Sequence, residues 1–306
     1  MNTMQSEINE IPIKASNFLK LSPSYSLPLG VPYLGMGSSY FAPLAFKYMG
    51  VPIFPEIASE YFNSYSGNRK SGKAVIISQS GQSSEALWCA RLFRSYIAIT
   101  NDAGSELSKN KNVSGAVSIL AGSEKYSSSK SYINTLLALF KGFGFDTEKA
   151  VSILVKKMPD YEHLGKKMAN EIFDQISRKR IHGIYVIGSG PNIATAYEAS
   201  LILSESTRLC FSGMPMAQYD HGPKETAANS IVIQIISKGK SWERSQKLNR
   251  PIVNAGAVVL TVEEPEVEEK FSVLHNIVPF NYLAYYLAQK LNISETFVVG
   301  GKVTTT

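Results

Sequence analysis

Short apolar runs alternate along the chain with longer segments in which apolar and polar residues are mixed. Residues 74–77, 97–99 and 258–260 are apolar throughout, which is typical of parallel strands buried on both faces of a sheet. The segments between such runs carry helical patterns, and strands that alternate with helices indicate a parallel sheet with helices on both sides. The hydrophobic pattern therefore predicts an α/β fold.

The same order of elements occurs twice. In each copy an apolar strand leads into a Gly/Ser turn and a helical run, and the leading glycines Gly35 and Gly188 are 153 positions apart. A second pair of strands, 74–77 and 231–236, leads into Gly81 and Gly239, which are 158 positions apart. Two matches at nearly one offset indicate a duplicated unit. We therefore expect two tandem domains, each a doubly wound parallel sheet flanked by helices (an α-β-α sandwich).

The boundary between these domains is expected within residues 146–162, after the glycine-containing turn at 142–144. A chain of 306 residues suffices for two domains of about 150 residues each. The predicted division is an N-terminal helical segment at 1–25, a first domain at 26–155, a second domain at 156–295 and a tail at 296–306.

Composition excludes several classes of protein. Hydrophobic residues make up 44% of the chain and charged residues 18%, which excludes a disordered protein. The longest apolar stretches, such as 255–262, are too short to span a bilayer, and the polar, acidic residues 1–10 do not resemble a signal peptide. The two cysteines, Cys89 and Cys210, cannot form a disulfide framework, which suits a reducing, cytoplasmic setting.

The net charge of +6 and the isoelectric point near 9.1 suggest an anionic partner. The basic residues are scattered and are not interleaved with aromatic residues, as they would be in a nucleic-acid-binding patch. A phosphorylated or otherwise anionic small ligand is therefore favoured over nucleic acid.

The strongest local signal is the sequence Ser78-Gln79-Ser80-Gly81-Gln82-Ser83-Ser84-Glu85. A buried strand ends here and a helix begins, so hydroxyl groups, backbone N–H groups and the positive end of a helix dipole meet, a combination that binds phosphate. The alternative is a serine-rich helix cap without a ligand. The duplicate loop has Lys238 in place of Ser80 and lacks most of the hydroxyls, which predicts one phosphate site per chain.

The turn at Gly35-x-Gly37-x-x-Tyr40 is a weaker signal. It lacks the third glycine of a dinucleotide-binding fingerprint, and no acidic residue follows a second strand at the required spacing. A nicotinamide cofactor is therefore excluded, and no other cofactor is predicted.

A helical run at 193–205 carries two glutamates, Glu198 and Glu205. Seven residues make nearly two turns, which places both carboxylates on one helix face, roughly 10 Å apart along the axis. That distance is too long for a tightly coupled acid–base pair, but one carboxylate could reach a reacting carbon while the other orders the pocket. The alternative, a solvated helix face, conflicts with the almost entirely apolar neighbours of the two glutamates.

His221 lies in a turn made by Gly222 and Pro223, where an imidazole can reach a ligand and change protonation near neutral pH. The alternative is a loop histidine without a special role. One histidine and one carboxylate are too few ligands for a metal ion, so no metal site is predicted.

Taken in order, these motifs resemble the isomerase half of glucosamine-6-phosphate synthase (glutamine–fructose-6-phosphate aminotransferase) and its shorter relatives, the double sugar-isomerase (SIS) domain proteins. The shorter relatives include SIS-type glucosamine-6-phosphate deaminases and fructosamine-6-phosphate deglycases. The resemblance covers nearly the whole chain, and its ordered matches are residues 4–12, 37–40, 56–61, 78–83 and 127–130, then Glu198, Glu205, His221-Gly222-Pro223 and Lys302.

The resemblance implies a role for each matching residue. Glu205 matches the base that carries a proton between C1 and C2, Glu198 a second carboxylate of the pocket, and Lys302 a tail lysine near the substrate. His221 matches the residue that opens the sugar ring, which in this family comes from the neighbouring subunit of a homodimer. Ser128 matches a position that lines the sugar, and the phosphate would be held by Gly37, Ser39, Ser78, Gln79, Ser80 and Ser83.

The chain also departs from the family pattern. The glutaminase domain and its catalytic cysteine are absent, so glutamine-dependent synthesis by this chain alone is not expected. Gln82 stands where the family often has glutamate, the 127–130 segment is one or two residues short, and the tail reads Gly300-Gly301-Lys302 in place of Leu-Ala-Lys. These departures bear on which sugar is bound more than on the phosphate site.

The resemblance therefore implies a cytoplasmic, dimeric, cofactor-free enzyme that acts on a phosphorylated amino sugar. The favoured reaction is isomerising deamination of glucosamine 6-phosphate to fructose 6-phosphate and ammonia, or the ammonia-dependent reverse. Two alternatives are a fructosamine-6-phosphate deglycase and a non-catalytic regulator that binds a sugar phosphate. The presence of Glu198, Glu205, His221 and Lys302 together argues against the regulator, as does the lack of an appended DNA-binding helix pair.

Overall fold

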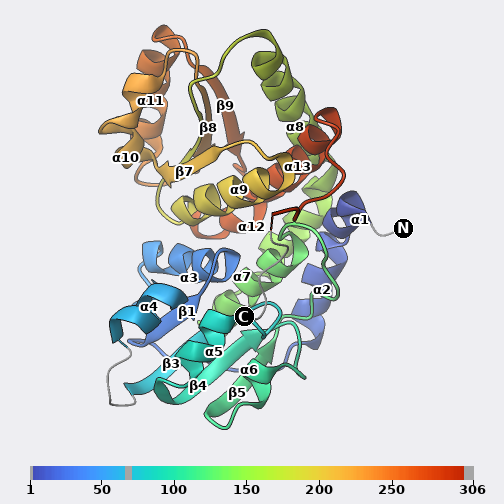
Figure 1. Ribbon diagram of the computed structural model, residues 1–306, viewed down its shortest axis with the longest axis vertical. Helices are drawn as coiled ribbons and strands as arrows, with labels where there is room; N and C mark the ends of the chain where they lie inside the picture. Colours follow the sequence, from blue (N-terminus) through green and yellow to red (C-terminus); the bar gives the residue numbers. More distant parts are fainter. Residues whose placement is uncertain (1–2, 66–70, 300–306) are drawn as a thin grey trace. The chain divides into compact units, whose positions relative to one another are not determined.

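The computed structural model of the protein describes residues 3–65 and 71–299 (Figure 1). These residues form two compact units. We call Glu10–Lys149 the first unit and Ala150–Phe297, to which the chain up to Asn9 also belongs, the second unit. Each unit is built around one parallel sheet.

The sheet of the first unit has five parallel strands in the order β2-β1-β3-β4-β5. The strands are β1 (Pro32–Gly35), β2 (Phe54–Ile57), β3 (Ser71–Ile77), β4 (Phe93–Thr100) and β5 (Val113–Ser118). The apolar residues 74–77 form the end of the central strand β3 and are almost completely buried. A central strand covered on both faces requires such a continuous apolar run, so the prediction of parallel, buried strands is confirmed.

Helices cover both faces of the first sheet. Around Leu34, Ile76 and Ala98 on one face pack α4 (Ala58–Tyr65), α5 (Ser84–Ala90) and α6 (Glu106–Lys109). The other face carries α2 (Ile11–Leu21), α3 (Ser38–Tyr48) and α7 (Lys130–Gly142). The rings of Phe46 in α3 and Phe140 in α7 meet edge to face there, with 4.7 Å between their centroids.

The sheet of the second unit has four parallel strands in the order β7-β6-β8-β9. The strands are β6 (Ile184–Gly188), β7 (Phe211–Pro215), β8 (Ile231–Ile236) and β9 (Val258–Glu263). On one face, α10 (Met216–Asp220) and α11 (Trp242–Asn254) pack over Ile187 and Val232. Two short 3-10 helices, η1 (Pro223–Thr226) and η2 (Glu269–Phe271), lie in the connections after α10 and β9.

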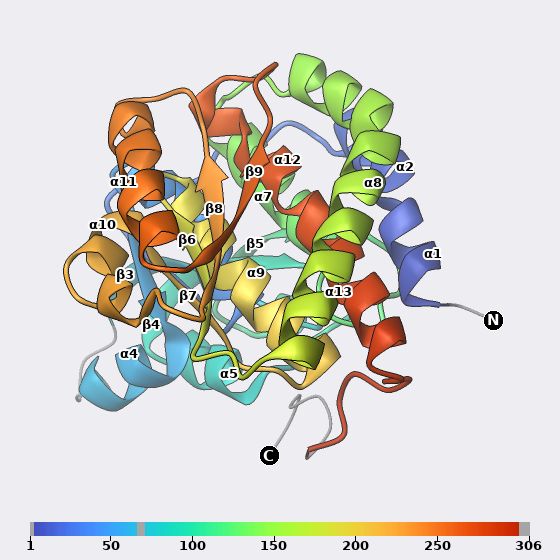
Figure 2. The same cartoon turned by 90° about the horizontal axis from the view of Figure 1, so that it is seen from above.

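The opposite face of the second sheet is covered by α9 (Asn192–Thr207), α12 (Val273–Asn276) and α13 (Val278–Lys290). Gly213 of β7 lies directly under α9, because a Cβ atom there would come within 2.4 Å of the carbonyl oxygen of Ala196. The long helix α8 (Glu148–Arg178) and the short helix α1 (Met4–Asn9) lie beside α13 (Figures 1 and 2).

The two sheets repeat one another in strand order and in register. The order β7-β6-β8-β9 reproduces β2-β1-β3-β4. Leu34 of β1 is paired with Ile76 of β3, and Ile187 of β6 is paired with Gln234 of β8, which are the partners expected from the offsets of 153 and 158. The repeat seen in the sequence therefore corresponds to two parallel sheets with matching central strands.

The two units meet in sequence between Lys149 and Ala150, whereas the sequence suggested 155/156, a position inside α8. The N-terminal segment, predicted as one piece at 1–25, is divided between the units. Residues of α1 bind to α13 through side chains: Tyr285 Oη donates to Gln5 Oε1 at 3.0 Å and Tyr282 Oη donates to Asn9 Oδ1 at 2.8 Å. The packing of α1 thus depends on tyrosines that lie 270 or more positions further along the chain. The local sequence around α1 does not show this contact.

Among the helices that the structure describes, none combines the length and the apolar character needed to cross a membrane.

Candidate functional site

The order of the first sheet changes direction between β1 and β3, with β2 on one side and β3, β4 and β5 on the other. In open α/β sheets the crevice at such a switch point, at the carboxyl ends of the strands, is the usual ligand site. Gly37 and Ser39 follow the end of β1, and the 78–83 loop follows the end of β3. We call Gly37, Ser39 and the 78–83 loop the first cradle. The six residues predicted to hold phosphate all belong to it.

The turn after β1 brings α3 close to the strand. A Cβ atom on Gly35 would lie 2.5 Å from the backbone carbon and oxygen of Ser39, so only glycine permits this approach. Gly37 then takes a positive φ of 50° at the N-cap of α3. As a result the half-buried Ser39 stands in the first turn of α3, beside the crevice.

Two hydroxyl groups of the 78–83 loop, those of Ser78 and Ser83, lie close together. The buried Ser78 Oγ lies 3.0 Å from Ser83 Oγ and accepts the backbone N–H of Gly81 at 3.1 Å. Ser80 Oγ accepts the N–H of Gln82 at 3.2 Å. The loop is therefore a compact turn whose serine hydroxyls gather at the carboxyl end of β3.

Ser83 occupies the N-cap position of α5, yet its side chain makes no capping hydrogen bond to the helix. A serine selected as a helix cap would accept an N–H of the first turn. Ser83 instead faces Ser78 across the loop. The alternative interpretation of this loop, a serine-rich helix cap, does not describe what Ser83 does.

Neighbouring segments hold the loop in place. Gly81 has a φ of 65°, and a Cβ atom on it would come within 2.1 Å of Ser105 Oγ. The carbonyl of Gln79 accepts hydrogen bonds from the Asn101 N–H at 3.0 Å and from Thr100 Oγ1 at 3.2 Å. The loop is thus packed against the end of β4 and the start of α6, which limits its freedom before any ligand binds.

Asn101 links this loop to the segment that carries Ser128. Its side chain accepts the N–H of Ala121 at 2.8 Å and donates to the carbonyl of Gly122 at 2.7 Å. The half-buried Ser128 follows in the same connection, 3.1 Å from Ser131 at the hydroxyl oxygens.

Glu124 explains part of the serine cluster at 127–131. Its carboxylate accepts the N–H of Ser129 at 3.1 Å and of Ser131 at 3.2 Å, and it also accepts both of their hydroxyl groups. The carboxylate thereby caps α7. Neither Glu124 nor Asn101 was identified from the sequence, because an isolated glutamate or asparagine in a loop carries no pattern.

The two predicted glutamates of the second unit lie on α9 as expected. Glu198 is completely buried, and Glu205 is half-buried near the C-terminal end of the helix. The low exposure of both side chains contradicts the alternative of a solvated helix face.

His221 is exposed and follows α10 directly. Within the second unit α10 and α9 cover opposite faces of the sheet (Figure 1). His221 and Glu205 therefore lie on opposite sides of this sheet in one chain. Lys302 lies outside the described residues.

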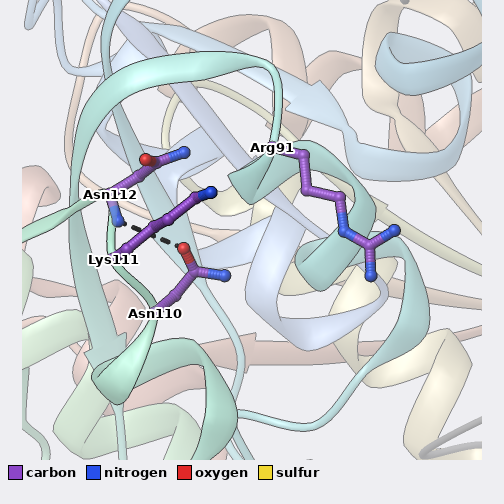
Figure 3. Close-up of a pocket in the computed structure, with 4 residues that line it drawn as sticks. All are labelled: Arg91, Asn110, Lys111 and Asn112. Atoms are coloured by element: carbon purple, nitrogen blue, oxygen red, sulfur yellow. Dashed lines mark hydrogen bonds between the residues drawn. The ribbon is translucent and has the colours of Figure 1, made fainter.

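A separate pocket of about 490 Å³ in the first unit is lined by Arg91, Asn110, Lys111 and Asn112 (Figure 3). Its residues precede β4 and β5, so it lies at the amino ends of the strands, away from the switch point. Asn110 Oδ1 accepts the Asn112 N–H at 3.1 Å, which orders the loop locally. Within the described residues, no group of three or more His, Cys, Asp or Glu side chains is arranged to bind a metal ion.

Known proteins resemble this chain in sequence and in fold. No protein-family profile matches the chain. A glutamine–fructose-6-phosphate aminotransferase [isomerizing] of Arabidopsis thaliana is 26% identical over 295 residues, covering 83% of this chain and 43% of that protein. The corresponding enzyme of Pyrococcus horikoshii is 25% identical over 288 residues, covering 83% of this chain and 48% of that protein. The chain thus spans under half the length of these relatives.

Solved structures share the fold. A glucosamine-6-phosphate deaminase from Thermotoga maritima matches with a TM-score of 0.78 and 20% identity, over 99% of this chain and 98% of that one. The C-terminal domain of the Francisella tularensis glucosamine-fructose-6-phosphate aminotransferase matches with a TM-score of 0.77 and 18% identity, over 100% and 98%. The chain therefore shares the fold of these two proteins, and its sequence is related to part of the aminotransferases.

Proposed function

We propose that the protein is a phosphosugar isomerase-type enzyme that binds its substrate through the first cradle. The observation that carries this proposal is the 78–83 loop: its hydroxyl groups converge at a switch point, and the serine at the helix cap position is not used as a cap. Hydroxyl and backbone N–H donors recognise a phosphate group without requiring a buried positive charge. The relationship to aminotransferases that act on fructose 6-phosphate supports a sugar phosphate as the ligand.

The reaction that we propose is isomerising deamination of glucosamine 6-phosphate, or its reverse with free ammonia. Glu205 takes the proton from C2 of the open-chain sugar and returns it to C1, which converts the 2-amino aldose into a 2-imino compound. Water then adds to the imine carbon and ammonia leaves, giving fructose 6-phosphate. Binding energy from the remote phosphate positions the reacting carbons against the carboxylate.

His221 is proposed to open the sugar ring in the site of a partner copy. Two facts support this assignment: the side chain is exposed, and a sheet separates it from Glu205 within one chain. In a homodimer, His221 of each chain would act together with Glu205 of the other chain. Glu198 is proposed to order the pocket from its buried position on α9, and Lys302 to contribute from the tail.

The test is a substrate panel with matched variants. Purified protein is incubated with glucosamine 6-phosphate, with fructosamine 6-phosphate conjugates, and with fructose 6-phosphate plus ammonia, while ammonia and the sugar phosphates are measured. We expect turnover of glucosamine 6-phosphate, a loss of about 10²–10⁴-fold in E205Q, and binding of the sugar phosphate unchanged within a few-fold. E243Q is the control, because the Glu243 side chain is 81% exposed on α11.

Each other outcome has a defined meaning. Release of amine only from fructosamine 6-phosphates would identify a deglycase. Binding without turnover of any substrate would identify a regulator. Equal loss of binding and turnover in E205Q would show that the glutamate supports the helix and does not transfer the proton.

A further inference from the structure

The second sheet has a switch point of its own, between β6 and β8. At the offset of 153, Gly190 and Asn192 stand where Gly37 and Ser39 stand in the first unit. At the offset of 158, the 237–241 loop stands where residues 79–83 stand, with Gly239 at the position of Gly81. We call Gly190, Asn192 and the 237–241 loop the second cradle. The backbone repeats as well, since Gly190 has a φ of 54° and Gly37 one of 50°.

The carboxylate of Glu269 lies inside this second cradle. A Cβ atom on Gly239 would come within 2.2–2.3 Å of all three carboxylate atoms, and one on Gly190 within 3.2 Å of Oε1. Ser237 Oγ donates to Glu269 Oε1 at 3.3 Å. An anionic group of the chain itself thus lies against the two glycines that correspond to Gly37 and Gly81 of the first cradle.

Buried side chains fix the segment that carries Glu269. Asn192 Nδ2 donates to Ser272 Oγ at 2.8 Å, and Ser272 Oγ donates to the carbonyl oxygen of Glu269 at 2.6 Å. Asn276 Nδ2 donates to Asn192 Oδ1 at 3.2 Å. Asn192, Ser272 and Asn276 are all 0–1% exposed. The backbone of Glu269 is therefore fixed through Ser272, which follows η2, and through the buried Asn192 of the second cradle.

The loop of the second cradle is also more cationic than its counterpart. Lys238 and Lys240 replace Ser80 and Gln82, and both are exposed beside Gly239. Two ammonium groups on a five-residue turn at the start of a 13-residue helix favour an anion at this position. The second loop has fewer serine hydroxyls than the 78–83 loop, but its two lysines still favour the binding of an anion.

We propose that the second cradle is a latent phosphate-binding site whose resident anion is the Glu269 carboxylate. In the native chain the carboxylate occupies the site, and a phosphate group binds there once the carboxylate is removed. This inference concerns the second unit alone and does not depend on the first cradle binding a ligand.

Inorganic phosphate is the probe that tests the proposal. Its binding stoichiometry is measured by calorimetric titration for the wild type, E269A, E269Q and the control E268A, and sulfate is titrated in parallel. Glu268 is adjacent to Glu269, its side chain is 71% exposed, and it pairs with Lys270 at 2.9 Å on the surface. We expect E269A to bind one more phosphate per chain than the wild type, whereas E268A gains none. E269Q is expected to gain none, because its amide fills the same space.

Thermal unfolding supplies a second measurement. Phosphate at about ten times its Kd should raise the Tm of E269A by roughly 2–6 °C more than that of the wild type. A folded E269A with the wild-type stoichiometry would overturn the proposal. If E269A is unfolded in phosphate-free buffer, refolding on addition of phosphate supports the proposal. Failure to refold, while E269Q is folded, overturns it.

The outcomes also separate this proposal from the proposed function. If E269A binds one phosphate and the wild type binds none, the proposal for the second cradle is supported and phosphate binding by the first cradle is rejected. A parallel titration with glucosamine 6-phosphate shows whether the vacated site accepts a sugar phosphate or only the free anion.

Discussion

The two switch points of this protein share a backbone but differ in what occupies them. In the first, Ser78 and Ser83 face one another at 3.0 Å between hydroxyl oxygens, with no acidic side chain among the residues of the cradle. In the second, the Glu269 carboxylate lies against Gly239 and accepts a hydrogen bond from Ser237. The same strand order and register place both switch points at the carboxyl ends of the central strands.

The difference shows that strand order decides where a crevice forms, whereas a few side chains decide whether a ligand can enter it. A crevice at the carboxyl ends of parallel strands collects backbone N–H groups, which attract anions. In the proposed function the first unit leaves this position to an external phosphate, whereas the second unit supplies the Glu269 carboxylate. Three predictions test how far this comparison extends.

The largest effect is expected from the matched glycines. In G81A the new Cβ would clash with Ser105 Oγ at 2.1 Å and the residue would keep a φ of 65°, so we expect a loss of about 2–4 kcal/mol in unfolding free energy. G239A meets only the flexible end of Glu269 and should cost less than about 1 kcal/mol. Urea unfolding of both variants provides the measurement. Equal costs would contradict the difference in packing between the two glycines.

A second effect of similar size is the dependence of the unfolding free energy of the second unit on pH. This unit contains all four histidines, at 163, 182, 221 and 275. Burial lowers the pKa of His275 from 6.5 to about 4, although the charge of Glu266 opposes the shift. His275 Nδ1 lies 2.8 Å from Tyr161 Oη, which donates to Glu264 Oε2 at 2.8 Å. Because Tyr161 donates its proton to Glu264, Nδ1–H of His275 donates to Tyr161 Oη, and the pKa of about 4 keeps the ring neutral at neutral pH.

The sign of the pH effect follows from this depressed pKa. Between pH 6.5 and 4 the unfolded chain binds a proton that the folded chain does not, so stability falls as the pH is lowered, by roughly 3 kcal/mol in total. One tryptophan lies in each unit, Trp88 in the first and Trp242 in the second. Urea unfolding of W88F and W242F variants at several pH values reports on each unit separately. H275N should flatten the profile of the second unit, and an unchanged profile would contradict the assignment.

The smallest effect is expected from the serines at the two helix caps. S83A should change the unfolding free energy by less than about 0.5 kcal/mol, because the side chain makes no capping bond, whereas an N-cap serine normally contributes about 1 kcal/mol. It should nevertheless weaken phosphate binding several-fold, as measured by calorimetry. S241A, at the matching position of the second loop, also lacks a capping bond and should change neither quantity. A full capping cost in S83A would restore the interpretation of the loop as a simple helix cap.

The fold and the first cradle were largely predictable from the sequence. Residues 74–77 identify a buried parallel strand, and the 78–83 loop is recognisable by five polar side chains around one glycine. The repeat at offsets of 153 and 158 correctly paired the central strands of the two sheets. These features are local, since each depends on residues close together in the chain or on a direct comparison of two segments.

Other features depend on side-chain contacts that no pattern in the sequence marks. The sequence predicted that Ser128 lines the sugar, but it did not show that the nearby Ser129 and Ser131 bind Glu124. The sequence shows that Lys238 replaces Ser80. It gives no sign that the second loop contacts Glu269, which lies 30 residues beyond Gly239.

The sequence alone therefore determined the class of fold, the internal repeat and the position of the first cradle, because hydrophobic periodicity and turn chemistry act over a few residues. The tertiary structure decided what fills the second cradle, which serines are available to a ligand, and that Glu205 and His221 lie on opposite faces of one sheet. Those outcomes result from packing between distant segments, where a carboxylate or a hydroxyl finds its partner only after the chain has folded.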